Sequence, residues 1–496
     1  MAPGLILAPP PRETADAMST LYFQSFESTY RILHRPSFWA EYERYWDDPG
    51  SASTSLRLKV LLVIAIGSSL HEQDDADSEF RNQVYQWIYA AQTWLSGPLE
   101  KDRLSFGGLQ IHCLMILARQ IFSVGGDLVW ISIGSLVHQA MQMGLSRDPK
   151  HLPPMSILKA ELRRRLWATI LEMAVQASLD SAMPPRISLD EFDTAAPSNV
   201  NDEDMDESTV ELHSRPTSIY TETSMQLILL DSLPTRLRIL RLLNDLHSEL
   251  SYPDILSLSS EITEASRVYT KLLNENSESG VTPFHRNLLD YLVRRFMIPL
   301  HCSFAHKART NPLFHYSLKV SIDAAMAIIS PEPDEAFHRL MIVGGGLFRE
   351  GFRYAMTSIG LELLSQVETQ RLDGTLHRTS QYRAILKKTL NDMIDLSLER
   401  MRKGETNVKS HMFLCMILAQ VEAIETGSSC ELKIAQGGKD SLELCYNLLQ
   451  TRARECSTAC PSGTEVGGTP STGLDGWAGS GLDFDINYFF LETDFS

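Results

Sequence analysis

The chain has 496 residues, a formal net charge of −17 at pH 7, and hydrophobic and charged contents of 43% and 22%. This composition is typical of a soluble globular protein, and the length predicts two or three substructures. The negative charge argues against a nucleic-acid-binding chain, because such domains neutralise phosphates with clustered Lys and Arg.

Residues 1–17 are rich in proline and small residues, which predicts a short disordered leader. The apolar run in this leader is too short for a signal peptide, and no basic residue precedes it. The apolar run Val60–Ile66 is cut short by Gly67-Ser68-Ser69, so no membrane span is expected.

Two short aromatic helices are predicted next, on either side of Pro36. The first is indicated by aromatic and aliphatic residues at steps of four, four and three: Tyr22, Phe26, Tyr30 and Leu33. Pro36 is expected to end this helix, because the residue before a proline favours extended geometry. Ser37 is then expected to cap a helix that carries Phe38, Trp39, Tyr42 and Tyr45 and stops at Asp47–Gly50.

From about residue 18 to 455 the pattern is helical almost throughout, which predicts an all-α, multi-helical domain. Leucines at steps of three and four from Leu227 to Leu250 predict one amphipathic helix, with Pro234 in its first turn. Convincing strand patterns and a fixed repeat period are lacking, so neither a sheet nor a simple solenoid is expected.

An acidic segment at about 187–222 interrupts this helical body. Between Ile187 and Glu211 it has nine acidic residues and no Lys or Arg. Such a composition buries little apolar surface, so the segment is predicted to be a solvated loop.

The C-terminal part, residues 456–496, has a different composition. Pro461–Ser480 is dominated by Gly, Ser and Thr, as in a flexible linker. Carboxylates then alternate with apolar side chains, and the last basic residue of the chain is Arg454. We expect this tail to be an activation segment that docks on a partner protein through Phe484, Ile486, Tyr488, Phe489, Phe490 and Phe495. The alternative is a tail that packs back onto the helical body.

No metal or cofactor site is predicted from the sequence. The seven cysteines are scattered, which fits a reducing compartment, and the pair Cys456 and Cys460 has no second pair nearby. A structural zinc site needs four ligands and a binuclear cluster more. The consecutive arginines Arg163–Arg165 spread around a helix, so we expect a solvated surface with one arginine paired to an acidic residue, rather than a nuclear-import or phosphate-binding patch.

An all-α enzyme is a remote alternative. Asp74-Asp75-Ala76-Asp77 is similar to the aspartate-rich motif of terpene synthases, although its third carboxylate comes one position early. Asn391, Asp395 and Glu399 share one helical face, as in the second magnesium-binding motif of those enzymes. Position 395 would normally be Ser or Thr there, and an exposed polar face explains the spacing more simply. The chain is therefore not expected to be an enzyme.

Several stretches occur in the order found in a known family. They are Tyr30–Trp39, Trp130–Pro149, Glu161–Trp167, Met183–Ile187, Arg295–Ile329 and Lys403–Lys409. Together they resemble the regulatory domain of fungal zinc-cluster transcription factors, often called the middle homology region. Met183-Pro184-Pro185-Arg186 departs from the Gly-Arg-Pro usual at that point. The cysteine-rich zinc cluster of the family is absent from this sequence.

The resemblance implies a nuclear transcription regulator, usually an activator, of a pathway or gene cluster in secondary metabolism, catabolism or drug resistance. Its partners would be a transcriptional coactivator or a DNA-binding protein, and a small-molecule effector is also implied. Direct DNA binding is expected only if a zinc cluster precedes this reading frame. The alternative function is a helical scaffold or ligand sensor without a role in transcription.

Overall fold

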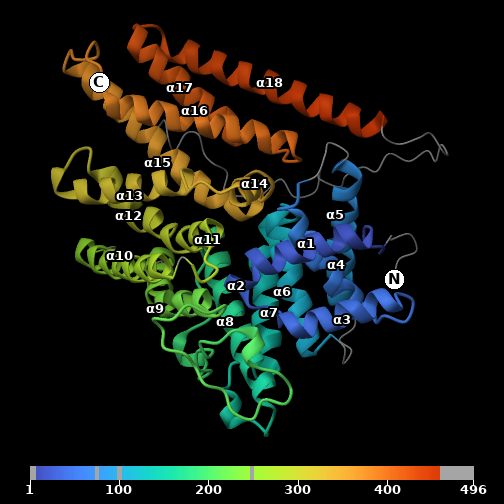
Figure 1. Ribbon diagram of the computed structural model, residues 1–496. Coiled ribbons are helices and arrows are strands. Elements are labelled where there is room, and N and C mark those ends of the chain that lie inside the picture. The colour runs from blue at the N-terminus through green and yellow to red at the C-terminus, as the bar shows by residue number, and fades with distance from the viewer. Residues whose placement is uncertain (1–6, 73–76, 98–102, 246–250, 277, 459–496) are drawn as a thin grey trace. The chain divides into compact units, whose positions relative to one another are not determined.

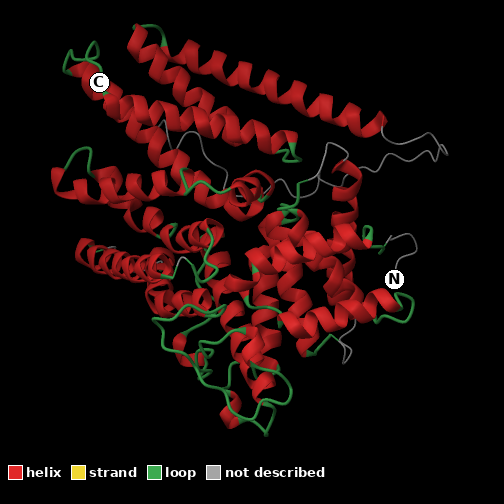
Figure 2. Cartoon of the chain, in the orientation of Figure 1, coloured by secondary structure: helices red, strands yellow, loops and turns green. Residues whose placement is uncertain are grey.

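The computed structural model describes residues 7–72, 77–97, 103–245, 251–276 and 278–458. Every regular element in these ranges is a helix, which confirms the all-α prediction (Figure 2). The α-helices are α1 (Arg12–Ser25), α2 (Glu27–Tyr30), α3 (Arg35–Asp47), α4 (Thr54–Ser68), α5 (Asp77–Ser96), α6 (Phe106–Ile121), α7 (Val129–Gln142), α8 (Ile157–Asp180), α9 (Ser224–Asn244), α10 (Tyr252–Glu275), α11 (Pro283–Arg294), α12 (Met297–Lys307), α13 (His315–Ile329), α14 (Glu335–Val343), α15 (Gly345–Leu372), α16 (Gln381–Arg402), α17 (Lys409–Thr426) and α18 (Cys430–Thr458).

The described residues up to Gln450 form one compact unit, and the end of α18 from Thr451 onward lies outside it. In this unit the helices pack mostly on neighbours in the chain. Helix α4 contacts α1 and α6, α6 contacts α7, and α8 contacts both α7 and α9 (Figure 1). Helix α15 contacts α6 as well as α13, α16 and α17, so it joins the later helices to the earlier ones. A continuous cluster of buried apolar side chains accordingly extends from Ala15 to Ile424.

The run Val60–Ile66 lies at the centre of this core. All seven of its side chains are buried within α4. Gly67 follows in the same helix and lies against the backbone of α1, where an added Cβ would come within 1.8 Å of the Met18 carbonyl oxygen. The glycine therefore permits the close approach of two helices and does not end the helix.

Helix boundaries near the N-terminus differ from those predicted. Helix α1 begins at Arg12, inside the predicted leader of residues 1–17. The first predicted aromatic helix is divided at Phe26 into α1 and α2. It ends at Tyr30 rather than at Pro36, and Pro36 stands in the first turn of α3. A proline at that point costs no hydrogen bond, since the first N–H groups of a helix lack intrahelical acceptors. Ser37 consequently lies inside α3 and does not cap it.

The predicted role of Gly144 is confirmed, whereas the predicted position of Pro234 is wrong. Gly144 follows α7 with a φ of +73° and ends the helix, as expected of a left-handed glycine cap. Pro234 lies in the interior of α9 and not in its first turn, because that helix already begins at Ser224. Leu250, the last leucine of the predicted run, lies outside the described residues.

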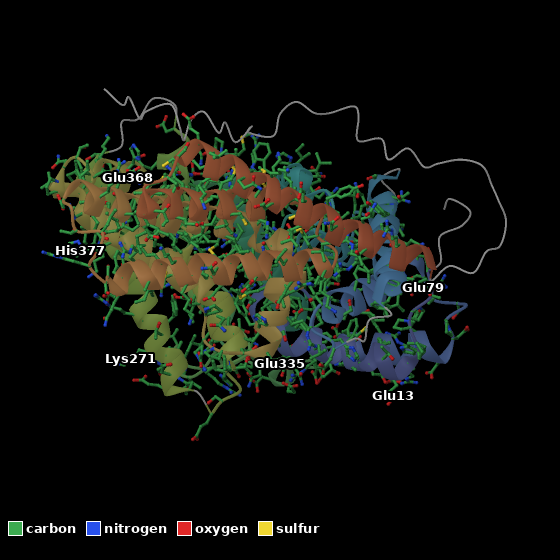
Figure 3. All side chains as sticks on the ribbon, turned by 90° about the horizontal axis from the view of Figure 1, so that it is seen from above. Glu13, Glu79, Lys271, Glu335, Glu368 and His377 are labelled. Carbon is green, nitrogen blue, oxygen red and sulfur yellow. The ribbon has the colours of Figure 1, made fainter. Side chains whose placement is uncertain are left out.

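Charged side chains largely occupy the outside of the helical body. Glu13, Lys271 and His377 are exposed and point away from the helices (Figure 3). None of the described helices combines the length and the apolar character that crossing a bilayer requires.

Candidate functional site

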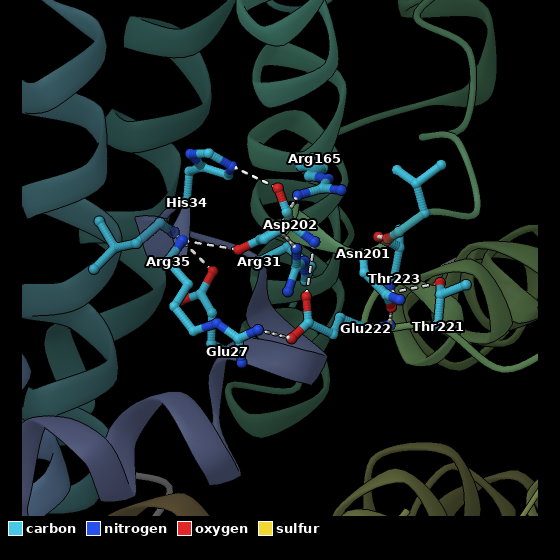
Figure 4. A network of polar contacts seen from close by, with 12 residues as sticks. Glu27, Arg31, His34, Arg35, Arg165, Asn201, Asp202, Thr221, Glu222 and Thr223 are labelled. Carbon is cyan, nitrogen blue, oxygen red and sulfur yellow. Dashed lines mark hydrogen bonds and ion pairs between the residues drawn. The ribbon is translucent and has the colours of Figure 1, made fainter. Parts of the chain in front are cut away.

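A buried ion cluster joins three segments that are far apart in the sequence. Asp202 lies in the 3-10 turn Asp202–Asp204 of the acidic segment, and its carboxylate contacts two guanidinium groups. One belongs to Arg31, just after α2, and the other to Arg165 of α8, whose Nη1 donates to Oδ1 at 2.6 Å. Figure 4 shows these side chains converging on Asp202.

The segment that leads into α3 also holds Asp202. The main-chain N–H of Arg35 donates to Oδ2 at 2.8 Å. His34 donates from Nε2 to the Asp202 carbonyl oxygen at 3.1 Å, while its Nδ1 lies 2.7 Å from the Ser37 hydroxyl. The stretch His34-Arg35-Pro36, which carries the family resemblance, thus provides two hydrogen-bond donors to the acidic segment.

The charges of this cluster are removed from water. The side chains of Arg31, Arg165 and Asp202 are at most 2% exposed. Burial alone would raise the pKa of the Asp202 carboxyl, but Arg31 and Arg165 outweigh it and hold this pKa well below its usual value. Burial, together with the nearby Arg31, lowers the pKa of Arg165 to about 10. All three groups are therefore charged at neutral pH.

Glu27 of α2 lies beside this cluster in a different protonation state. Burial raises its pKa to about 8, although Arg31 opposes the shift. Its carboxyl also accepts hydrogen bonds from the Tyr22 hydroxyl at 2.6 Å and from the Leu33 main-chain N–H at 2.8 Å. The side chain is fully buried within the aromatic helices, and at neutral pH it is mostly protonated.

Side-chain hydrogen bonds fold the acidic segment back on itself. The Asn199 amide donates to the carbonyl oxygens of Pro216 and Ile219 at 3.0 and 2.9 Å, and its Oδ1 accepts from the Thr221 hydroxyl at 2.6 Å. The main-chain N–H of Asp202 donates to Glu222 at 2.8 Å (Figure 4). The segment contains short 3-10 turns and no α-helix. The prediction of a solvated loop is wrong for Asp202, which is fully buried.

The three consecutive arginines have separate partners. Arg163 donates to the Met143 carbonyl oxygen at 2.9 Å, and Arg165 binds Asp202. Arg164 forms a two-pronged pair with Asp148, at 3.0 and 3.1 Å. The expectation of a solvated helix surface is therefore wrong for Arg165, and this run is no free phosphate-binding patch.

The Arg164–Asp148 pair fixes a second family-like stretch. Asp148 follows the glycine cap of α7 and also accepts from the main-chain N–H groups of Lys150 and Ala195, at 3.1 and 3.0 Å. The Arg186 guanidinium lies 4.2 Å from the centre of the Trp130 ring, which ties the Met183–Ile187 stretch to α7. The family-like stretches before residue 200 are thus held together by arginines.

Helices α8 and α9 are joined by another buried pair. Arg236 of α9 donates to both carboxylate oxygens of Glu172, at 2.8 and 2.7 Å. With Glu161, Arg165, Thr169 and Gln176, Glu172 forms a buried polar stripe at steps of three and four along α8. This stripe inside an apolar helix is the signal in the sequence that could have identified Arg165 as buried. The position of Asp202 could not be found in the same way, because it depends on loop geometry.

A cleft lies beside the same segments. It has a volume of about 440 Å³ and is lined by apolar side chains such as Phe38 and Leu162, and also by the charged Lys59, Glu41 and Arg163. Lys59 and Glu41 form an ion pair at 2.8 Å. The volume and mostly apolar lining are those of a small-molecule site.

The remaining residues singled out in the sequence lie away from the Asp202 cluster or outside the described residues. Asn391, Asp395 and Glu399 lie on α16, and the Asn391 amide donates to the Lys387 carbonyl oxygen. Asp74 and Asp75 lie outside the described residues. Among the residues that are described, no three His, Cys, Asp or Glu side chains are placed to hold a metal ion. Phe484, Ile486, Tyr488, Phe489, Phe490 and Phe495 also lie outside the described ranges.

Comparison with known proteins finds a family model that matches the first half of the helical body. The model of the fungal-specific transcription factor domain matches residues 20–278, a range that contains the whole Asp202 cluster. The chain belongs to this family. The family is one of transcription factors and not of enzymes, in agreement with the prediction, and the terpene-synthase alternative is dropped.

Named relatives are similar over nearly the whole chain. Transcription factor asR3 of Sarocladium schorii is 46% identical over 99% of this chain and 62% of its own length. Transcription factor opdR of Penicillium oxalicum is 35% identical over 98% of this chain and 64% of its own length. The aspyridones cluster regulator apdR of Emericella nidulans is 28% identical over 84% of this chain and 58% of its own length. The chain thus spans less than two thirds of the length of these relatives, and no solved structure matches it.

Proposed function

We propose that this fungal transcription factor family member regulates a biosynthetic gene cluster in the nucleus. The observation that carries the proposal is the similarity to asR3 over 99% of the chain, supported by the match to the fungal-specific domain. The printed name of apdR, a cluster regulator, supports the choice of a biosynthetic cluster over a catabolic or drug-resistance pathway.

The test is expression profiling of a deletion strain, combined with chromatin immunoprecipitation of the tagged protein. We expect expression of a contiguous set of biosynthetic genes to fall and the protein to be recovered at their promoters. Complementation with the wild-type gene is the control. A distribution outside the nucleus under every inducing condition, with no change in transcript levels, would instead support the scaffold or sensor alternative.

The tail is proposed to supply the activating function. Its carboxylates alternate with Phe484, Ile486, Tyr488, Phe489, Phe490 and Phe495, and no basic residue follows Arg454. Carboxylates keep such a segment soluble while the apolar side chains bind a groove on a coactivator. Residues 461–496 fused to a heterologous DNA-binding domain are expected to activate a reporter. Alanine at the six apolar positions should abolish this activity, whereas a fusion that is inactive from the start refutes the role of the tail.

Contact with DNA is proposed to come from a zinc cluster preceding this reading frame or from a DNA-binding partner. Mapping the 5′ end of the transcript separates the two. An in-frame exon with six spaced cysteines supports the first, and co-purification of a second DNA-binding protein supports the other.

A small-molecule effector is proposed to bind the cleft beside α3. Its volume of about 440 Å³ and its lining by Phe38, Leu162 and Arg163 would suit an apolar molecule with an acidic group. A thermal-shift screen of intermediates of the regulated pathway tests this, since a bound ligand raises the melting temperature. A hit should be lost on Phe38→Ala and retained on Tyr382→Ala, a substitution of an exposed aromatic residue on α16.

A further inference from the structure

Helix α18 packs on α17 through one of its faces. The Ser441 hydroxyl lies 2.6 Å from Nδ1 of His411, and Cys445 is buried next to the same ring. A Cβ added at Gly437 would lie 2.8 Å from the Cβ of Ala419, so the two helices approach closely. Figures 1 and 3 both show α18 alongside the neighbouring C-terminal helices.

A second face of α18 carries apolar side chains that are exposed. Leu432, Leu442 and Tyr446 are 71%, 46% and 64% exposed. These residues belong to a series at alternating steps of three and four: Leu432, Ala435, Lys439, Leu442, Tyr446 and Leu449. Alternating steps of three and four place side chains on one seam of a helix, the pattern by which two helices pack along their length.

We propose that this seam is the interface with a second copy of the chain, paired antiparallel with its two-fold axis at Leu442. In such a pair, a residue before Leu442 in one copy faces the residue equally far after Leu442 in the other, and the two side chains complement each other. Ala435 comes seven positions before it and Leu449 seven positions after it, so a small side chain of each copy lies opposite a large one of the other. Leu442 packs on Leu442 of the second copy. An isologous interface requires this kind of complementarity with itself.

The charges on the seam determine the direction of pairing. Lys439 lies three positions before the axis and Tyr446 four positions after it, so the ammonium of one copy meets the aromatic ring of the other. Glu443, which pairs with Lys439 within the chain at 3.7 Å, lies next to this contact. A parallel arrangement would place Lys439 against Lys439, and like charges at the seam would repel each other.

The seam is short and gives a weak dimer. A pair of single helices of this length buries less than about 1,200 Å², the lower limit of standard interfaces. Sedimentation equilibrium of the full chain across about 1–100 µM is expected to show a reversible monomer–dimer equilibrium.

Matched substitutions on one helix test the surface. Leu442→Asp should raise the dissociation constant about 100-fold, because it removes both leucines at the axis. Leu444→Asp is the control, since Leu444 is 49% exposed on the same helix but lies off the seam. A chain that is monomeric throughout, a dimer that survives Leu442→Asp, or an equal loss with Leu444→Asp would overturn the proposal. In the first case, recovery of a different protein on the seam would identify another occupant.

Cross-linking tests the register. An equimolar mixture of the Lys439→Cys and Tyr446→Cys variants should form a disulfide-linked dimer under mild oxidation. Either variant alone should not exceed the level of the wild-type chain, which retains its own cysteines. Efficient cross-linking by each variant alone would show parallel pairing and contradict the antiparallel arrangement.

Discussion

Asp202→Asn tests whether the buried ion cluster holds the folded domain together. The substitution keeps the size of the side chain but removes the carboxylate that Arg31 and Arg165 share. Both guanidinium groups are at most 2% exposed, so water does not replace the lost partner. Breaking a buried ion pair from one side costs about 3–5 kcal/mol, and we expect a loss of that order in the free energy of unfolding.

Asp204→Asn is the matched control in the same turn. Its carboxylate pairs with Arg215 at 3.0 Å, but the two side chains are 33% and 40% exposed. Exposed pairs contribute about 0–1 kcal/mol. Urea unfolding followed by circular dichroism measures both variants. Equal shifts of the two midpoints would refute the argument that burial makes the Asp202 cluster different.

The pH dependence of the free energy of unfolding provides a second test of the Asp202 cluster. The folded-state pKa of Asp202 is depressed, so its stabilising contribution is present above the ordinary aspartate pKa of about 4. As the pH falls below that value, the carboxyl of the unfolded chain is protonated first, and the contribution is lost progressively until the pH reaches the depressed folded-state pKa. The destabilisation of Asp202→Asn relative to wild type should therefore shrink as the pH falls below about 4.

Three further substitutions test the packing of the helical body. The folded pKa of Glu27 is raised to about 8, so its protonated form stabilises the fold at low pH and this contribution disappears as the pH rises to 8. Relative to Glu27→Gln, the wild type should lose up to about 1.4 kcal/mol per pH unit between pH 5 and 8, and identical slopes in urea unfolding would contradict the assignment. Gly67→Ala should destabilise by about 1–3 kcal/mol, because its methyl group would meet the Met18 carbonyl. Gly134→Ala in α7, with open space around it, should stabilise by up to about 1 kcal/mol, and thermal unfolding of both variants checks the contrast.

The sequence predicted the helical class well, because periodic apolar residues are a local signal. The aromatic residues Tyr22, Phe26 and Tyr30 are buried as their spacing indicated. Two of the errors in helix boundaries occur at prolines, since the same residue can end a helix or stand near its start. Pro36 stands in the first turn of α3 and Pro234 in the interior of α9, and only the surrounding packing decides between these positions.

The ion cluster was beyond local reasoning for a different reason. Arg165 and Asp202 are 37 positions apart, and Arg31 and Asp202 are 171 apart. An acidic run with no Lys or Arg within it was expected to be solvated, because no partner is visible in the adjacent sequence. The partners come instead from α8 and from the segment between α2 and α3, and they are brought together by the fold.

The acidic loop and the acidic tail therefore differ in chemistry despite their similar charge. In the loop, Asp202 forms ion pairs with Arg31 and Arg165, and Asp204 forms one with Arg215. The aromatic content also differs, because Phe192 and Tyr220 are the only aromatic residues between positions 187 and 222, whereas the tail has aromatics at most of its docking positions.

This contrast gives a last prediction for the activation assay. Residues 187–222, fused to the same heterologous DNA-binding domain as the tail, carry carboxylates with two aromatic side chains, Phe192 and Tyr220, for a coactivator groove to bind. We expect this fusion to activate the reporter no more than the bare domain, while residues 461–496 activate it. Equal activation by both segments would mean that acidity alone is sufficient, and the six apolar side chains of the tail would lose their proposed role.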